Sequence, residues 1–168
     1  MFQKAMIIGS PGSGKSTFAR ALKEIKGLPL YHLDMMYWNA DKTVVSKEVF
    51  HKRLNGALQS DAWIIDGNYN STIEMRLTHC DIVFFLDYPT EVCLDGIKAR
   101  FGKPREDMPW IETEEDTEFI NFIKSFNEES KPKILSLFEK HPEKEVITFH
   151  SREESTTYLQ HFQKQLKK

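Results

Sequence analysis

The chain has 168 residues, of which 40% are hydrophobic and 29% charged, and these values predict one soluble domain over residues 1–168 with a buried core. The formal net charge of −2 lacks the basic excess of dedicated DNA-binding domains, so a tight, direct nucleic-acid ligand is not expected. No apolar segment has the length of a membrane span or a secretory signal core, and Cys80 and Cys93 lack zinc-site spacing. We therefore expect a cytoplasmic protein with reduced thiols and no membrane association.

Short apolar segments alternate with longer amphipathic ones, which is the pattern of a parallel sheet covered by helices. The strand candidates are rich in Ile, Val and Phe, as strands buried on both faces are. Pro132 should kink its helix or force it to restart. In chain order, the predicted elements are strand 4–9, helix 15–26, strand 28–34, helix 46–60, strands 62–67 and 81–87, helix 90–101, helix 116–127 with its continuation beyond Pro132, strand 145–150 and helix 152–166.

Residues 9–16 read GSPGSGKS and match the phosphate-binding pattern G-x-x-x-x-G-K-[ST] at every fixed position. The motif follows an apolar strand and precedes a helix, which is the context that makes it specific. Lys15 would contact the β- and γ-phosphates of ATP, and the Ser16 hydroxyl would bind Mg²⁺. The residues expected to bind the nucleotide are Gly9, Ser10, Pro11, Gly12, Ser13, Gly14, Lys15, Ser16 and Thr17.

The loop and the element order together predict a three-layer α/β fold of the P-loop NTPase type, with a five-stranded parallel sheet in the order 2-3-1-4-5. A carboxylate is needed on the metal side, at the end of a strand beside the loop strand. Asp66 and Asp87 both end a predicted strand. We favour Asp66, because the third strand adjoins the first in this order, and expect Asp87 to cap the helix that follows Pro89.

Asp34 ends the second predicted strand, and ligands collect at the carboxyl ends of parallel strands. It is a candidate for accepting a proton from a substrate hydroxyl, although an ordinary turn residue explains it equally well. Trp38 is a candidate wall for a base or sugar, although aromatic residues more often simply pack. His32 shares the strand face of Asp34, and an isolated strand histidine is more often structural, so no role is assigned to it.

Residues 102–115 read GKPREDMPWIETEE, a segment with two prolines, a glycine and many charges that fits neither a strand nor a core helix. A solvated surface loop is the simpler interpretation. The functional alternative is a short mobile lid that carries Lys103 and Arg105 over the nucleotide.

The segments GSPGSGKST, LD with Trp38, WIIDGNY, CDIVFFLDYP and KAR resemble the adenylate-kinase-related P-loop kinases over nearly the whole chain. Within that group they are most similar to the bacterial proteins known as DNA topology modulation protein, FlaR-related. The resemblance implies that Asp66 organises Mg²⁺ through water. It also implies that Arg100 faces the triphosphate at the base of the lid, and that Arg105 reaches the transferring phosphoryl group.

The chain departs from these kinases where they use an arginine to grip the acceptor phosphate, since DGNYN stands in place of DGFPR or DGYPR. Arg76, one short helix downstream, is a candidate replacement, and a surface ion pair is an equally plausible role for it. After the lid, the chain offers only lysines where the family has one or two further arginines. The candidate acceptor-site residues are Asp34, Trp38, Asp66 and Arg76.

These features predict an ATP-dependent kinase that transfers the γ-phosphoryl group to a nucleotide, a nucleoside or another small hydroxyl compound. Lys15, Arg100 and Arg105 would neutralise charge, and Asp34 or Asp66 would orient the attacking oxygen. The missing arginine disfavours ordinary AMP as the acceptor. The alternative function is an ATP-binding regulator of DNA topology or gene expression with little phosphotransfer, which the near-neutral charge does not favour. The sequence leaves the acceptor and the oligomeric state open.

Overall fold

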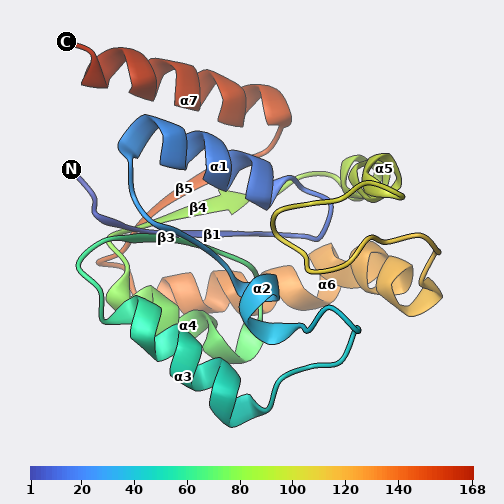
Figure 1. Ribbon diagram of the computed structural model, residues 1–168. Helices are drawn as coiled ribbons and strands as arrows, with labels where there is room; N and C mark the ends of the chain where they lie inside the picture. The colour runs from blue at the N-terminus through green and yellow to red at the C-terminus, as the bar shows by residue number, and fades with distance from the viewer.

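The computed structural model describes residues 1–168 and shows a five-stranded parallel sheet between two layers of helices (Figure 1). The strand order is β2-β3-β1-β4-β5, and every neighbouring pair is parallel, which confirms the predicted fold and order. The strands are β1 (Lys4–Gly9), β2 (Leu30–His32), β3 (Trp63–Asp66), β4 (Ile82–Leu86) and β5 (Glu145–Phe149). The helices are α1 (Lys15–Lys26), α2 (Leu33–Tyr37), α3 (Lys47–Leu58), α4 (Asn70–His79), α5 (Thr90–Arg100), α6 (Thr117–Lys140) and α7 (Arg152–Leu166).

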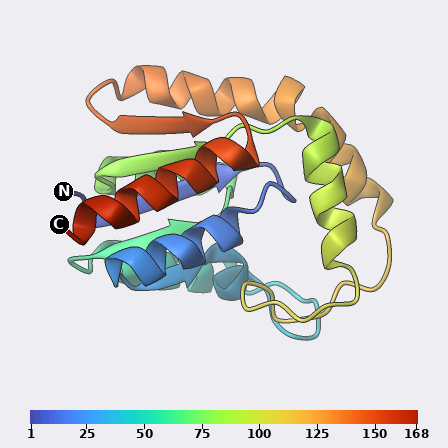
Figure 2. The same ribbon diagram turned by 90° about the horizontal axis from the view of Figure 1, so that it is seen from above.

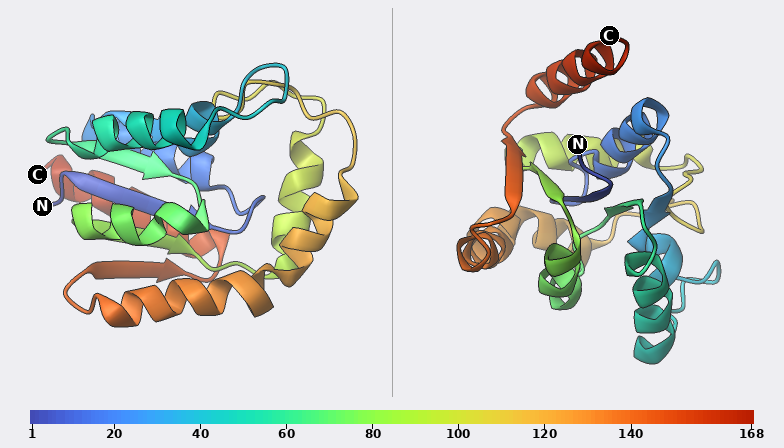
Figure 3. Two further views of the ribbon diagram at one scale, coloured as in Figure 1. Left: turned by 90° about the horizontal axis from the view of Figure 1, so that it is seen from below. Right: turned by 90° about the vertical axis from the view of Figure 1, so that its left-hand side faces the viewer.

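The core has two halves because successive residues of a buried strand face opposite sides of the sheet. Met6 and Ile8 of β1 pack with α3, α4 and α6 on one face, and Ala5 and Ile7 pack with α1 and α7 on the other. Figure 3 shows these helices on the two faces, with the C-terminal helix outermost. None of the helices is long and apolar enough to cross a membrane.

One element differs from the sequence prediction, and another follows one of the two predicted alternatives. The second strand is only three residues long and gives way to the short helix α2 at Leu33, so Asp34 lies on a helix and not at a strand end. Helix α6 runs through Pro132 as one continuous helix and does not restart there. Proline has no N–H to offer the preceding turn, and α6 changes direction along its length in Figures 2 and 3, as the predicted kink requires.

Helix α5 stands beyond the carboxyl ends of the strands and packs against α6 (Figure 2). Residues 102–115, here called the lid segment, connect these two helices without a helix or strand of their own. The lid segment lies beside the loop that follows α2, where Trp110 meets Trp38 with their ring centroids 4.9 Å apart. It therefore covers the edge of the sheet at which the phosphate loop ends β1.

Candidate active site

A pocket of about 1210 Å³ opens between the phosphate loop, the ends of β2 and β3, and the lid segment. Six of the nine residues predicted to bind the nucleotide line it: Pro11, Gly12, Gly14, Lys15, Ser16 and Thr17. Gly9, Ser10 and Ser13 lie behind that surface, and both serines are buried. The pocket thus occupies the end of the sheet where parallel α/β proteins bind their ligands.

The phosphate loop has the tight backbone that its glycines predict. Gly12 has a φ of 82°, and a Cβ added there would lie 2.0 Å from the carbonyl oxygen of Cys93, so no larger residue fits. The Lys15 Nζ donates to the Ser10 carbonyl at 3.1 Å. Burial lowers the pKa of Lys15, although Asp66 and Asp34 nearby act to raise it. Because the Lys15 ammonium group is buried, its attraction to a phosphate would be stronger here than in water.

Arg152 supports this loop from the far end of the chain. Its guanidinium donates to the carbonyl oxygens of Gly12 at 3.1 Å and Ser13 at 2.9 Å, and it lies 5.6 Å from the ring centre of Tyr88. Nothing in the local sequence pointed to Arg152, because its partners are about 140 residues away. The contacts fix two carbonyl groups of a loop whose N–H groups must face outward to bind phosphate.

Asp66 ends β3 and is only 5% exposed, at the edge of the pocket. Its Oδ2 lies 2.6 Å from Nδ1 of His32, the residue paired with it in the register of β2 and β3. Burial acts to lower the pKa of His32, but the hydrogen bond and charge of Asp66, together with Asp107, outweigh it and raise the pKa. The sequence analysis gave His32 no role, and the structure makes it the partner that orients Asp66.

Asn68 and Tyr69, which stand just before the position of the acceptor-phosphate arginine in the resembling kinases, both have structural partners. The Asn68 side chain accepts from the Gly9 N–H at 3.1 Å and donates to the Gly9 carbonyl at 2.6 Å, which ties it to the start of the phosphate loop. The Tyr69 hydroxyl donates to Asp34 Oδ1 at 2.5 Å. Burial raises the pKa of Asp34 even though Tyr69 and Lys15 act to lower it. Asp34 thus lies in the pocket, as the hypothesis of a substrate-binding carboxylate requires.

Arg76 does not fit its predicted role. Its side chain is fully buried, away from the pocket lining. It donates to the Thr72 hydroxyl at 3.1 Å, to the Gly67 carbonyl at 2.8 Å and to the Asn68 carbonyl. Burial lowers its pKa to about 9. All three of its side-chain nitrogens are used within the protein, one on Thr72 of α4 and two on the turn after β3. Arg76 therefore makes neither an acceptor-phosphate contact nor a surface ion pair.

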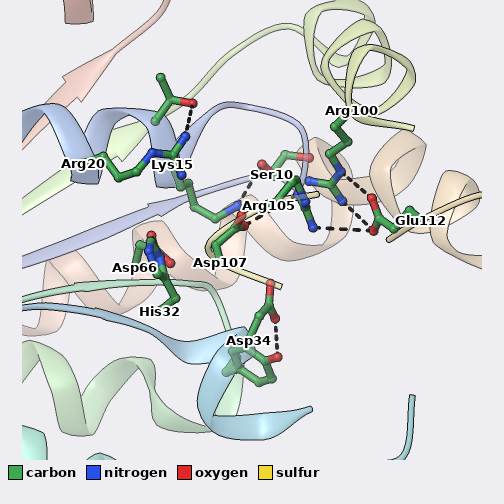
Figure 4. Close-up of polar contacts among 12 residues, drawn as sticks. Ser10, Lys15, Arg20, His32, Asp34, Asp66, Arg100, Arg105, Asp107 and Glu112 are labelled. Atoms are coloured by element: carbon green, nitrogen blue, oxygen red, sulfur yellow. Dashed lines mark hydrogen bonds and ion pairs between the residues drawn. The ribbon is translucent and has the colours of Figure 1, made fainter. Parts of the chain in front are cut away.

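The lid segment brings Arg105 into the pocket beside Arg100 (Figure 4). Arg100 forms two hydrogen bonds to Glu112, at 2.8 and 3.1 Å, and Arg105 lies 3.6 Å from Asp107 and 3.8 Å from Glu112. Burial and the charge of Arg105 lower the pKa of Arg100, and Glu112 opposes this. The Arg105 Nη2 is buried without a hydrogen-bond partner, so it is free to donate to a ligand.

Asp107 is a buried carboxylate that the sequence analysis did not single out. Burial acts to raise its pKa, but Arg105, Ser16 and His32 outweigh it and lower the pKa. No group of three His, Cys, Asp or Glu side chains in the chain could chelate a metal ion. Ser16, Asp66 and Asp107 nevertheless offer hard oxygen atoms at one end of the pocket, which suits Mg²⁺, since that ion keeps several waters and is shared with phosphates.

Asp87, the other strand-ending aspartate, lies outside this constellation. Its carboxylate pairs with Lys131 at 2.7 Å and lies 3.5 Å from His150, and it makes no capping bond to α5. The expected cap is therefore wrong, and the preference for Asp66 at the phosphate loop agrees with the geometry.

No protein-family model matches the chain. In sequence it is similar to an adenylate kinase of Xylella fastidiosa, at 32% identity over 124 residues, and to one of Thermosipho melanesiensis, at 29% over 118 residues. These alignments cover 67% and 66% of this chain but only 63% and 54% of the relatives, so the chain matches less than two thirds of their length.

The structure is similar to a shikimate kinase from Bacteroides thetaiotaomicron, with a TM-score of 0.65 and 16% identity over all of both chains. It is also similar to deoxyadenosine kinase from M. mycoides, with a TM-score of 0.55 and 16% identity over 98% of this chain and 100% of the other. The chain has the fold of these kinases. At this level of identity the likeness defines the fold alone, so the activity has to be argued from the pocket.

Proposed function

We propose that the protein is an ATP-dependent phosphotransferase of the adenylate-kinase-related type, which transfers the γ-phosphoryl group of ATP to a nucleotide, a nucleoside or another small hydroxyl compound. The observation that carries this proposal is the convergence of Lys15, Arg100 and Arg105 on one pocket that also contains the carboxylate of Asp34. The sequence similarity to adenylate kinases supports the same reaction class.

Each basic group has a separate task in such a transfer. The loop N–H groups and the amino end of α1 bind the phosphate chain, and Lys15 reaches the β- and γ-phosphates. Arg105, whose Nη2 makes no hydrogen bond within the protein, donates to the γ-phosphoryl oxygens as their charge redistributes, and Arg100 adds positive charge at the base of the lid. Mg²⁺, when bound through Ser16 and through water to Asp66, neutralises phosphate charge.

The lid segment has a part in selecting transfer over hydrolysis. It borders the pocket beside the phosphate loop, and most of its residues between Pro104 and Glu115 contribute to the lining. A covered site excludes water that would compete with the acceptor for the γ-phosphoryl group. The resemblance to the topology modulation group is compatible with a kinase. A regulator with little phosphotransfer is not favoured by the similarity to adenylate kinases.

The experiment is coupled ADP release with Mg-ATP across a panel of nucleotides, nucleosides and small hydroxyl metabolites. We expect at least one compound to raise the rate above the rate without acceptor, and Lys15→Ala to abolish both this rate and the thermal stabilisation by ATP. Arg105→Ala should slow turnover while ATP affinity stays nearly intact, with Lys103→Ala in the exposed part of the lid as the matched control. ADP release that no compound raises would contradict the kinase proposal.

A further inference from the structure

We call the part of the pocket formed by Asp34, Trp38, Tyr69 and Trp110 its α2 end. The two indole rings meet edge to face, one from the end of α2 and one from the lid segment. Tyr69 donates to Asp34 and packs against Tyr37, whose ring meets the indole of Trp38 edge to face. This end therefore presents one carboxylate and an aromatic surface, and small-molecule sites typically combine aromatic walls with a few polar groups that fix the ligand's orientation.

Basic side chains are outnumbered by acidic ones in the pocket. Five of them line the pocket against eight acidic ones, and Lys15, Arg100 and Arg105 serve the triphosphate. Arg20 lies on α1 with its guanidinium 3.4 Å from the Thr17 hydroxyl, and Lys42 is exposed in the loop after α2. With Arg76 turned into the protein interior, Lys15 is the one cation whose charge acts on Asp34, and the triphosphate already uses it, so none is left to neutralise a phosphate on the acceptor.

The turn that follows β3 holds Tyr69 in an uncommon backbone conformation. Tyr69 has a φ of 37°, in the left-handed region that residues other than glycine rarely adopt. Asn68 is anchored on Gly9 and the turn carbonyls on Arg76, so this backbone conformation is held from two sides. Its effect is to place the Tyr69 hydroxyl on Asp34 Oδ1, which leaves Asp34 Oδ2 without a protein hydrogen-bond partner. Strained residues of this kind cluster at functional sites.

We infer that the acceptor is an uncharged ring compound with a free hydroxyl group, such as a nucleoside, and not a phosphomonoester such as a nucleoside monophosphate. This inference rests on the proposed kinase function. A phosphate dianion at the α2 end would face the Asp34 carboxylate. The two negative charges would repel each other, and more strongly in this partly buried site than in water. An uncharged hydroxyl instead donates its hydrogen to Asp34 Oδ2 while its ring packs against Trp38 and Trp110.

The transfer step then balances as follows. The acceptor oxygen forms a bond to the γ-phosphorus as the bond from that phosphorus to the β–γ bridging oxygen breaks. ADP leaves with the electron pair, and the hydroxyl proton passes to Asp34 Oδ2. Asp34 is the catalytic residue in this scheme, and Tyr69 is a positioning residue that holds Oδ1.

The test measures phosphorylation of matched pairs, each an uncharged compound and its phosphomonoester: the common nucleosides with their 5′-monophosphates, and glucose with glucose 6-phosphate. We expect at least one uncharged member to have a kcat/KM more than about tenfold above its phosphomonoester. Phosphorylation of phosphomonoesters alone would overturn this inference and leave the kinase proposal standing. Phosphorylation of no member, charged or uncharged, would overturn both.

Variants at the α2 end supply a second readout. Asp34→Asn should lower kcat by about a hundredfold or more with ATP affinity unchanged, because an amide cannot take the proton. Asp34 is faced by Tyr69, Lys15, Asp66 and Asp107, and Tyr69 acts to lower its pKa. Tyr69→Phe should therefore shift the acidic limb of the kcat/KM profile to higher pH. An unshifted limb would contradict the positioning role, and a higher KM for phosphomonoesters alone in Arg20→Ala would contradict the acceptor class.

Discussion

Asp66 and His32 face each other across β3 and β2, with 2.6 Å between Oδ2 and Nδ1. Their side chains are only 6% and 10% exposed, so water competes little with this contact. Asp66 lines the pocket beside the phosphate loop, and the imidazole fixes the direction of its carboxylate. The edge strand β2, which pairs with β3 alone, thereby contributes to the geometry of the metal side of the site.

Replacing His32 by glutamine should lower stability in a pH-dependent way. The folded state raises the pKa of His32, because the bond and charge of Asp66 outweigh burial, which lowers it. The charged imidazole therefore contributes stability that is fully present below the unfolded pKa of about 6.5 and is lost as pH rises through the folded value. Urea unfolding at several pH values measures this, with the exposed His161→Gln as control. A loss that is the same at every pH would contradict the assignment.

Arg76→Lys should destabilise the protein by about 2–4 kcal/mol, because lysine cannot satisfy the three acceptors that the guanidinium now reaches. Urea denaturation gives the free energy of unfolding directly. Arg20→Lys, on the surface of α1, should change it by less than about 0.5 kcal/mol. If Arg76→Lys instead kept full stability and raised the acceptor KM, the phosphate-gripping hypothesis would be correct after all.

Arg152→Ala should weaken ATP binding by roughly tenfold, since the loop carbonyls of Gly12 and Ser13 lose their charged donor. Isothermal titration with Mg-ATP measures the affinity. Glu153→Ala is the matched control, because the neighbouring side chain is exposed and makes no contact with the loop. Equal affinities in wild type and the Arg152 variant would show that the loop keeps its shape unaided.

Asp34→Asn should make the protein more stable near pH 7, in contrast to its expected loss of activity. Burial raises the pKa of Asp34, so the ionised carboxylate costs stability that the folded state recovers as pH falls through that raised value. The advantage of the variant should vanish below about pH 4, where aspartate is protonated in both states. Asp41→Asn is a control of opposite sign, because bonds from Thr43 lower the pKa of Asp41. Thermal unfolding as a function of pH distinguishes the two.

The sequence by itself determined the parts of this protein that depend on local pattern. The glycine spacing of residues 9–16 specifies a backbone that faces phosphate, and Ile, Val and Phe runs specify strands buried on both faces. The sequence also predicts the start of a helix where a capping residue marks it. Ser46 is an example, because its side chain accepts from the Val49 N–H and caps α3. The short helix α2 had no such signal, since a three-residue edge strand gives little pattern to read.

Only the tertiary structure decided which polar side chains meet. His32 pairs with Asp66 across the sheet, Arg152 supports the phosphate loop from the last helix, and Arg76 turns inward to hold the turn after β3. Each contact joins groups whose hydrogen-bonding needs are met only when distant segments pack, because a buried donor or acceptor must find a partner inside the protein. Composition and periodicity record which residues are buried, whereas the partner of each buried polar group depends on how the chain folds back on itself.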